Sequence, residues 1–381
     1  MIRLNPPPRS FALLALVLLA IAPSRAQSSD APLTSQELVS LVYQLPRHPE
    51  KRDEIVAEIR KRGIGFPLTE GLRGVVASKS GNDALLRRTL EEAERRRLNP
   101  AGSTLPPPAE AEEVLVRARR AAIEGAQTIP DFIVKQLVTR SAAREQTRNW
   151  RVLDRLTVAV SYRESAGEQY KLIAVNGLPE AEVGPERSTY EQAGGSTTRG
   201  EFATLLLKLF DPESETEFKP VDTDTVRGRR CIVYEFTIKR SKALNKLSYG
   251  RLGEGGRETF SGMHGRVWID REIARALRME FTATEVEPDF PIKDLENRID
   301  FDWVTIGDEK YLMPVTAETI FTTTVPVTYY DPRREMKVTE MTTIQNRNEI
   351  RFRNYQKFGA EVKIIEDVDD FEDEPQPEKK P

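Results

Sequence analysis

The sequence predicts an α+β protein in which a small N-terminal helical bundle precedes a strongly curved antiparallel sheet. Within residues 34–98 apolar side chains recur at helical spacing. A linker over residues 99–110 follows, with consecutive prolines at 106–108 that stiffen it. From residue 130 onward, apolar and polar side chains alternate with a period of two. We expect about nine to eleven strands, too many for a flat open sheet, and therefore a partial barrel.

The composition excludes several classes of protein. The 381 residues include 57 basic and 60 acidic side chains, one cysteine and two histidines. A single cysteine excludes an intramolecular disulfide framework and a cysteine-rich zinc site. The near balance of charge argues against a basic nucleic-acid binder. We expect no metal, no cofactor and no nucleic-acid partner.

The sequence predicts that the segments at both ends of the chain lie outside the folded domains. Arg3 and Arg9 precede an apolar run over residues 11–21, which Pro23 follows, with small residues at −3 (Ser24) and −1 (Ala26) from the expected cleavage point. As a helix, that run would span about 16 Å, against about 30 Å of membrane hydrocarbon. The pattern therefore favours a signal peptide over residues 1–26, cleaved after Ala26, rather than a membrane anchor. We expect a periplasmic or secreted protein that does not span the membrane.

Residues 361–381 carry nine acidic and three basic side chains. Such an acidic, proline-containing tail buries too little apolar area to fold, so we predict disorder there.

The bundle at 34–98 is predicted to hold three or four short helices. One apolar stripe combines Leu38, Leu41, Val42 and Leu45. Asn82 is the expected N-cap of the last helix, which ends in the basic run 95–97. We interpret that run as a solvated helix end whose cations suit the negative pole of the helix dipole.

Two further helices are expected around the sheet, one from about residue 110 to 127 and one over Glu201–Phe210. Late in the chain, long strands around 310–328 and 336–353 flank Asp331 and Pro332, a pair favoured in type I turns.

Each arrangement of residues in the sequence that resembles a catalytic site has a simpler structural interpretation. His264 lies near Ser261 and Asp270, but no Gly-x-Ser-x-Gly motif accompanies them, so we interpret His264 as a turn residue. Cys231 has no neighbouring base and is expected to be a buried apolar side chain.

Three other patterns are equally weak. Asp300 and Asp302 could pair as glycosidase carboxylates, but we place them on the wet face of the sheet. Asp222 and Asp224 lack the other ligands of a calcium loop. The run 194–198 lacks a Walker lysine and is expected to be a flexible loop. We therefore expect a protein that is not an enzyme.

Four short segments carry a resemblance to a known family: Gly265–Asp270 (GRVWID), Arg275–Phe281 (RALRMEF), Phe301–Gly307 (FDWVTIG) and Tyr311–Pro314 (YLMP). Their succession resembles the periplasmic LolA/LolB-like family of outer-membrane lipoprotein sorting, over roughly residues 110–358. The resemblance implies a half-barrel domain over residues 111–360, with helical lids on its concave side and an apolar cavity beneath them.

The expected function is therefore an exported envelope protein that binds an apolar ligand, an acyl chain or a lipoprotein-like molecule, in the half-barrel. The side chains expected to line the cavity are Val267, Ile269, Met279, Phe281, Ile299, Phe301 and Trp303. The alternative is a non-enzymatic interaction or scaffold protein whose helical bundle binds an envelope protein partner. A hydrolase is a third hypothesis, which the scarcity of histidine disfavours.

Overall fold

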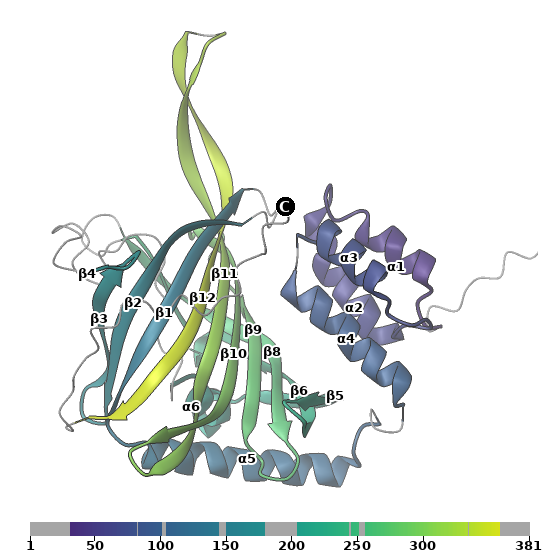
Figure 1. Ribbon diagram of the computed structural model, residues 1–381, viewed down its shortest axis with the longest axis vertical. Helices are drawn as coiled ribbons and strands as arrows, with labels where there is room; N and C mark the ends of the chain where they lie inside the picture. Colours follow the sequence, from purple (N-terminus) through teal and green to yellow (C-terminus); the bar gives the residue numbers. More distant parts are fainter. Residues whose placement is uncertain are drawn as a thin grey trace, which may run out of the picture.

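The computed structural model describes residues 31–81, 83–100, 104–144, 150–179, 204–243, 245–250, 256–333 and 335–358. The segments predicted to be a signal peptide (1–26), an acidic tail (361–381) and a loop (194–198) lie outside these residues, as does Asn82. The described part consists of a four-helix bundle, a long connecting helix and a large curved antiparallel sheet (Figure 1).

The bundle contains α1 (Ser35–Val42), α2 (Arg52–Arg62), α3 (Glu70–Lys79) and α4 (Ala84–Leu98), as the apolar periodicity predicted. Thr34 and Thr69 cap α1 and α3 through their side-chain oxygens. At α4, Asp83 accepts the backbone N–H of Leu86, so the described N-cap is Asp83 and the prediction of Asn82 was wrong. The apolar stripes of all four helices meet in a core of their own, which includes Leu38, Ile59 and Leu86.

The connecting helix α5 (Pro108–Thr128) starts on the last residue of the proline run, where a missing N–H costs nothing. The sheet then follows with β1 (Phe132–Arg144), β2 (Arg151–Arg163), β3 (Gly167–Val175), β4 (Leu178–Pro179), β5 (Glu217–Val226), β6 (Arg229–Ile238), β7 (Asn245–Tyr249), β8 (Arg257–Asp270), β9 (Ala276–Thr284), β10 (Ile292–Ile306), β11 (Glu309–Asp331) and β12 (Met336–Lys357). Two short helices, α6 (Thr204–Phe210) and α7 (Arg240–Ala243), interrupt this succession.

The strands form a 12-stranded sheet in the order β4-β3-β2-β1-β12-β11-β10-β9-β8-β6-β5, with β7 paired to β8. Neighbouring strands pair antiparallel, and the ends of the order do not meet, so the sheet is open. The count exceeds the nine to eleven strands expected because β4 and β7 are too short to show an alternation in sequence.

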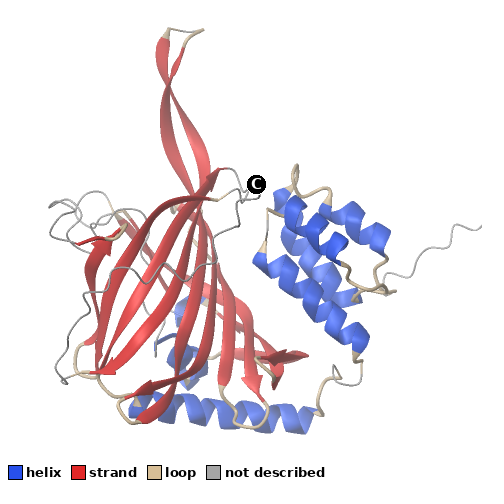
Figure 2. Cartoon of the chain, viewed as in Figure 1, coloured by secondary structure: helices blue, strands red, loops and turns tan. Residues whose placement is uncertain are grey.

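Helices α5 and α6 pack against the concave side of the sheet, and the bundle lies beside the sheet against its other face (Figure 2). The largest apolar core combines the inward side chains of the strands with Val114, Leu115 and Ala118 of α5 and with Leu209 and Phe210 of α6. The β11–β12 hairpin extends well beyond the rest of the sheet (Figure 1), since beyond Thr323 β11 pairs with β12 alone.

Candidate functional site

Six of the seven side chains expected to line a cavity lie on the concave face of the sheet and are buried. The strand register aligns Val267 of β8 with Met279 of β9, and Met279 with Ile299 of β10, so these three form one row across the sheet. All six belong to the large apolar core: Val267, Ile269, Met279, Phe281, Ile299 and Phe301. Their place in the interior is confirmed, whereas ligand binding by them stays a prediction.

Trp303 is not buried with the other six, and its expected place in the interior was wrong. Its side chain is 45% exposed, while Val304 packs against the core. β9 pairs with β10 only as far as Asp300, and the register with β11 shifts between Asp300 and Phe301. Beyond this point no described strand pairs with β10 on the β9 side, so Trp303 lacks the cover that buries Ile299 and Phe301.

The helices α5 and α6 cover the concave face unevenly. The first half of α5 is fixed to the sheet, where the Tyr234 hydroxyl donates to the backbone oxygen of Ala111 at 2.7 Å. Arg117 donates to the carbonyl of Arg271 in the β8–β9 turn at 2.8 Å. In the second half of α5, and at the start of α6, the apolar side chains that face the core are only partly buried: Ala122, Leu205 and Leu206.

The residues weighed for catalysis do not form a triad. His264 lies in the middle of β8, not in a turn, with its Nδ1 3.0 Å from the Thr237 hydroxyl. Ser261 instead accepts a hydrogen bond from Asn245, and Asp270 accepts one from Arg229.

The buried Cys231 fits the apolar interpretation. Burial, with the nearby charge of Asp270, raises the pKa of its thiol to about 12.

Two assignments of charged residues to the solvent need correction. Asp300 is 6% exposed and bonds to Arg278 at 2.6 Å and to Arg298 at 3.0 Å, so it does not lie on a wet face. Burial alone would raise its pKa, but the two guanidinium charges hold the pKa below its usual value. Asp302, by contrast, is half-exposed beside Arg227.

The basic end of α4 is the second correction, because it contacts the sheet rather than only solvent. Arg95 pairs with Asp224, and Arg96 lies 3.4 Å from Asp222, both on β5. Asp224 also accepts the indole N–H of Trp268 at 2.9 Å.

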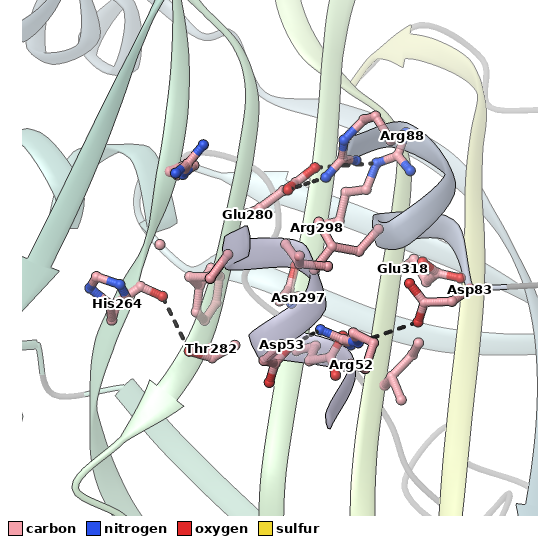
Figure 3. A pocket seen from close by; sticks show the side chains of 18 of the residues that line it. Arg52, Asp53, Asp83, Arg88, His264, Glu280, Thr282, Asn297, Arg298 and Glu318 are labelled. Atoms are coloured by element: carbon pink, nitrogen blue, oxygen red, sulfur yellow. Dashed lines mark hydrogen bonds and ion pairs between the residues drawn. The ribbon is translucent and has the colours of Figure 1, made fainter. Parts of the chain in front are cut away.

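Behind these contacts, the outer face of the sheet and the bundle enclose a charged cavity of about 600 Å³ (Figure 3). Its helical wall comes from α2 and from the start of α4, and its sheet wall comes from strands β6 and β8–β12. The charged and polar residues that line it include Arg52, Asp53, Arg60, Lys61, Asp83, Arg88, Glu235, His264, Arg266, Glu280, Thr282, Glu296, Arg298, Glu318 and Arg347.

Ion pairs join the two walls of this cavity. Arg52 of α2, only 7% exposed, bonds to Glu296 of β10 and lies 3.4 Å from Asp83. Burial would lower the pKa of Arg52, but these carboxylates raise it above its usual value. Arg88 of α4 pairs with Glu280 of β9. The cavity was not predicted from the sequence. The only signal for it is that the outward positions of successive strands carry many charged residues, which is compatible with a second face of the sheet covered by other elements.

Comparisons with known proteins identify no family for this chain. No family model matches the sequence, and no curated protein matches it. Among solved structures, a DUF1329 family protein from Desulfovibrio piger is similar, with 11% sequence identity and a TM-score of 0.29. The match covers 66% of this chain and 94% of that chain. A likeness this distant carries no argument about function.

The described residues contain neither a membrane-spanning helix nor a metal-binding group of side chains. None of their helices combines the length and apolar character needed to cross a bilayer. Nor do they bring together three or more histidine, cysteine, aspartate or glutamate side chains in a group that could hold a metal ion.

Proposed function

We propose that this chain is a LolA-like envelope protein, exported to the periplasm, that binds an apolar ligand between the concave face of its sheet and the helices α5 and α6. The ligand class is an acyl chain or a lipoprotein-like molecule. The protein is proposed to act by binding and not by catalysis.

The observation that carries this proposal is the unevenly covered apolar face. The row Val267, Met279 and Ile299 is buried, but Leu205 and Leu206 on α6 are only partly covered. Partly exposed apolar side chains on the two helices that cover this face favour occupation by an apolar chain, since each buried methylene contributes about 0.8 kcal/mol.

The direct test is mass spectrometry of an organic extract of protein purified from its native envelope, with the intact mass measured on the same sample. We expect a co-purifying acyl-chain compound and a mature chain that begins near Gln27. Recovery of the protein from the cytoplasm with its first 26 residues retained would refute export.

A matched pair of variants on α5 tests where the ligand binds. Ala122 packs partly buried against the apolar core, whereas Val116 is 46% exposed on the outer side of the same helix. A carboxylate at residue 122 would have to be desolvated next to the ligand, so Ala122→Glu should weaken binding of an apolar fluorescent dye by tenfold or more, about 1.4 kcal/mol. Val116→Glu should bind the dye as the parent does. Equal binding by both variants would refute the concave site.

One observation favours the alternative, an interaction or scaffold protein. The protruding β11–β12 hairpin exposes large side chains near its tip: Tyr329, Tyr330, Met336 and Met341. Unlike the bundle, whose α2 and α4 face its own sheet, this hairpin is free to contact an envelope partner. Absence of any extracted ligand and of dye binding in the parent would favour this alternative.

A further inference from the structure

The cavity between the bundle and the sheet lies on the outer face, so what it binds is independent of the apolar ligand proposed for the concave face. Most of its carboxylates already have a cationic partner. Glu296 and Asp83 contact Arg52, Glu280 contacts Arg88, and Glu318 lies 3.9 Å from Arg347.

Two guanidinium groups in the cavity have no such partner. Among the described residues, no carboxylate oxygen lies within 4 Å of the side-chain nitrogens of Arg60 on α2 or Arg266 on β8. Arg266 stands opposite Glu235 and Glu280 in the strand register, yet it pairs with neither at that distance. Both arginines line the same cavity from opposite walls.

The positive charge of Arg266 acts on the guanidinium group of Arg60 across the cavity. Burial, together with the positive charge of Arg266, lowers the pKa of Arg60 to about 10. Glu92 and Glu280 act in the opposite direction, but they are shared with Arg88. Two like charges held on facing walls of one partly buried cavity are unfavourable unless an anion lies near them.

Buried donors without hydrogen-bond partners also favour an anion in this cavity. The Arg60 Nε atom and the Arg88 Nη1 atom are buried and have no hydrogen-bond partner among the described residues, while Arg88 Nε lies 3.3 Å from a carboxylate oxygen of Glu92. A buried donor without an acceptor loses its hydration without compensation. An oxyanion in the cavity would supply acceptors to these donors and balance the charges of Arg60 and Arg266.

We propose that this cavity is a binding site for a phosphate dianion, either inorganic phosphate or a small phosphomonoester, held between Arg60 and Arg266. A tetrahedral dianion presents oxygens in several directions and can meet two guanidinium groups from different walls, while a carboxylate presents one planar edge to one of them. A cavity of about 600 Å³ has room for an organic group attached to the phosphate. Because α2 and β8 each contribute one arginine, the bound anion also stabilises the docking of the bundle on the sheet.

Calorimetric titration of the full-length purified chain with inorganic phosphate and with glycerol 1-phosphate tests the site directly. A pH of about 8 keeps the phosphomonoester doubly charged, since its second pKa is about 6. Both ligands should bind, and acetate at matched ionic strength should not. Absence of phosphate binding, or equal binding of acetate, would overturn the proposal.

The variants Arg60→Gln and Arg266→Gln should each weaken phosphate binding by about 10- to 100-fold, as expected for loss of a charge-assisted hydrogen bond. Arg87→Gln is the control, because Arg87 is exposed on the solvent side of α4, one residue from Arg88. It should bind phosphate as the parent does.

A second measurement distinguishes a ligand site from a structural role of these arginines. In phosphate-free buffer, either glutamine variant should melt at or above the parent's temperature, because it removes one of two repelling charges. Phosphate should raise the melting temperature of the parent and of Arg87→Gln only. A lower melting temperature of both Arg60→Gln and Arg266→Gln in phosphate-free buffer, with an unchanged response to phosphate, would show that the arginines only hold the bundle in place and would overturn the proposal.

Discussion

Asp270, at the end of β8, offers the sharpest test of how the sheet is held together. It is 1% exposed, and its carboxylate accepts the backbone N–H groups of Glu272 at 2.8 Å and Ile273 at 3.0 Å, along with the guanidinium of Arg229. These bonds shape the tight turn into β9. Asp270→Asn keeps the shape of the side chain but replaces one acceptor oxygen by an amide donor and removes the charge.

The magnitude follows from the bonds that are lost. A hydrogen bond to a charged group contributes about 1.5–3 kcal/mol, and the amide that Asp270→Asn introduces would face the Arg229 donor instead of accepting from it. Because the Arg229 side chain is 37% exposed, water compensates part of this loss. We expect Asp270→Asn to lower the free energy of unfolding by about 2–3 kcal/mol at neutral pH.

The pH dependence provides an independent check. Burial would raise the pKa of Asp270, but the bonds from Arg229, Ile273 and Glu272 outweigh it and lower the pKa. A carboxyl group whose pKa is lower in the folded state stabilises the fold above its unfolded pKa, about 3.9, and this stabilisation is lost as the pH falls through the folded value. The difference between parent and variant should therefore be constant above about pH 5 and shrink below it.

Urea unfolding of parent and variant across this pH range measures that difference. Asp302→Asn is the matched control, because the Asp302 carboxylate is 44% exposed beside Arg227. This substitution should lower the free energy of unfolding by less than about 1 kcal/mol. The reasoning fails if Asp270→Asn unfolds at the parent's urea concentration at neutral pH. It fails equally if the difference does not change with acidification.

Three further predictions concern burial in the sheet. Trp268→Ala should lower the free energy of unfolding by about 3–5 kcal/mol, because Trp268 is buried. Trp303→Ala should lower it by only about 1 kcal/mol, because Trp303 is half-exposed. Thermal unfolding that ranks the two variants in reverse would contradict this difference in burial. The Cys231 thiol, with its pKa raised to about 12, should react with a thiol reagent only after denaturant is added, so rapid labelling of the native protein would show that the site is open. Gly265→Ala would place a methyl group in direct overlap with the backbone oxygen of Glu280 and should cost about 3 kcal/mol or more, and normal thermal stability would rule out that close approach.

Several features of the fold could be predicted from sequence because local patterns specify them. Strict alternation predicts that Ile299 and Phe301 share one face of β10, since side chains of a strand point alternately to its two faces. Both are buried in the structure. Helical spacing likewise predicts the stripe of Leu38 and Val42 in α1. These assignments need no knowledge of which strands become neighbours.

Trp303 marks the limit of that reasoning. The alternation within β10 places it with Ile299 and Phe301, but its burial depends on where β9 stops pairing. The end of a neighbouring strand is a long-range property, which the sequence around Trp303 does not encode.

The outer face shows the same limit more strongly. In sequence Asp300 resembles a solvent-facing residue, and the arginines at 95–97 resemble a solvated helix end. Only the pairing of β9 with β10 brings Arg278 to Asp300, and only the docking of the bundle on the sheet pairs Arg95 with Asp224. By itself, the sequence determined the helical bundle, the alternating strands and the apolar face. Tertiary structure alone decided that a second face is covered and that Arg60 and Arg266 share one cavity, because charged side chains far apart in the chain are brought together only when separate elements pack.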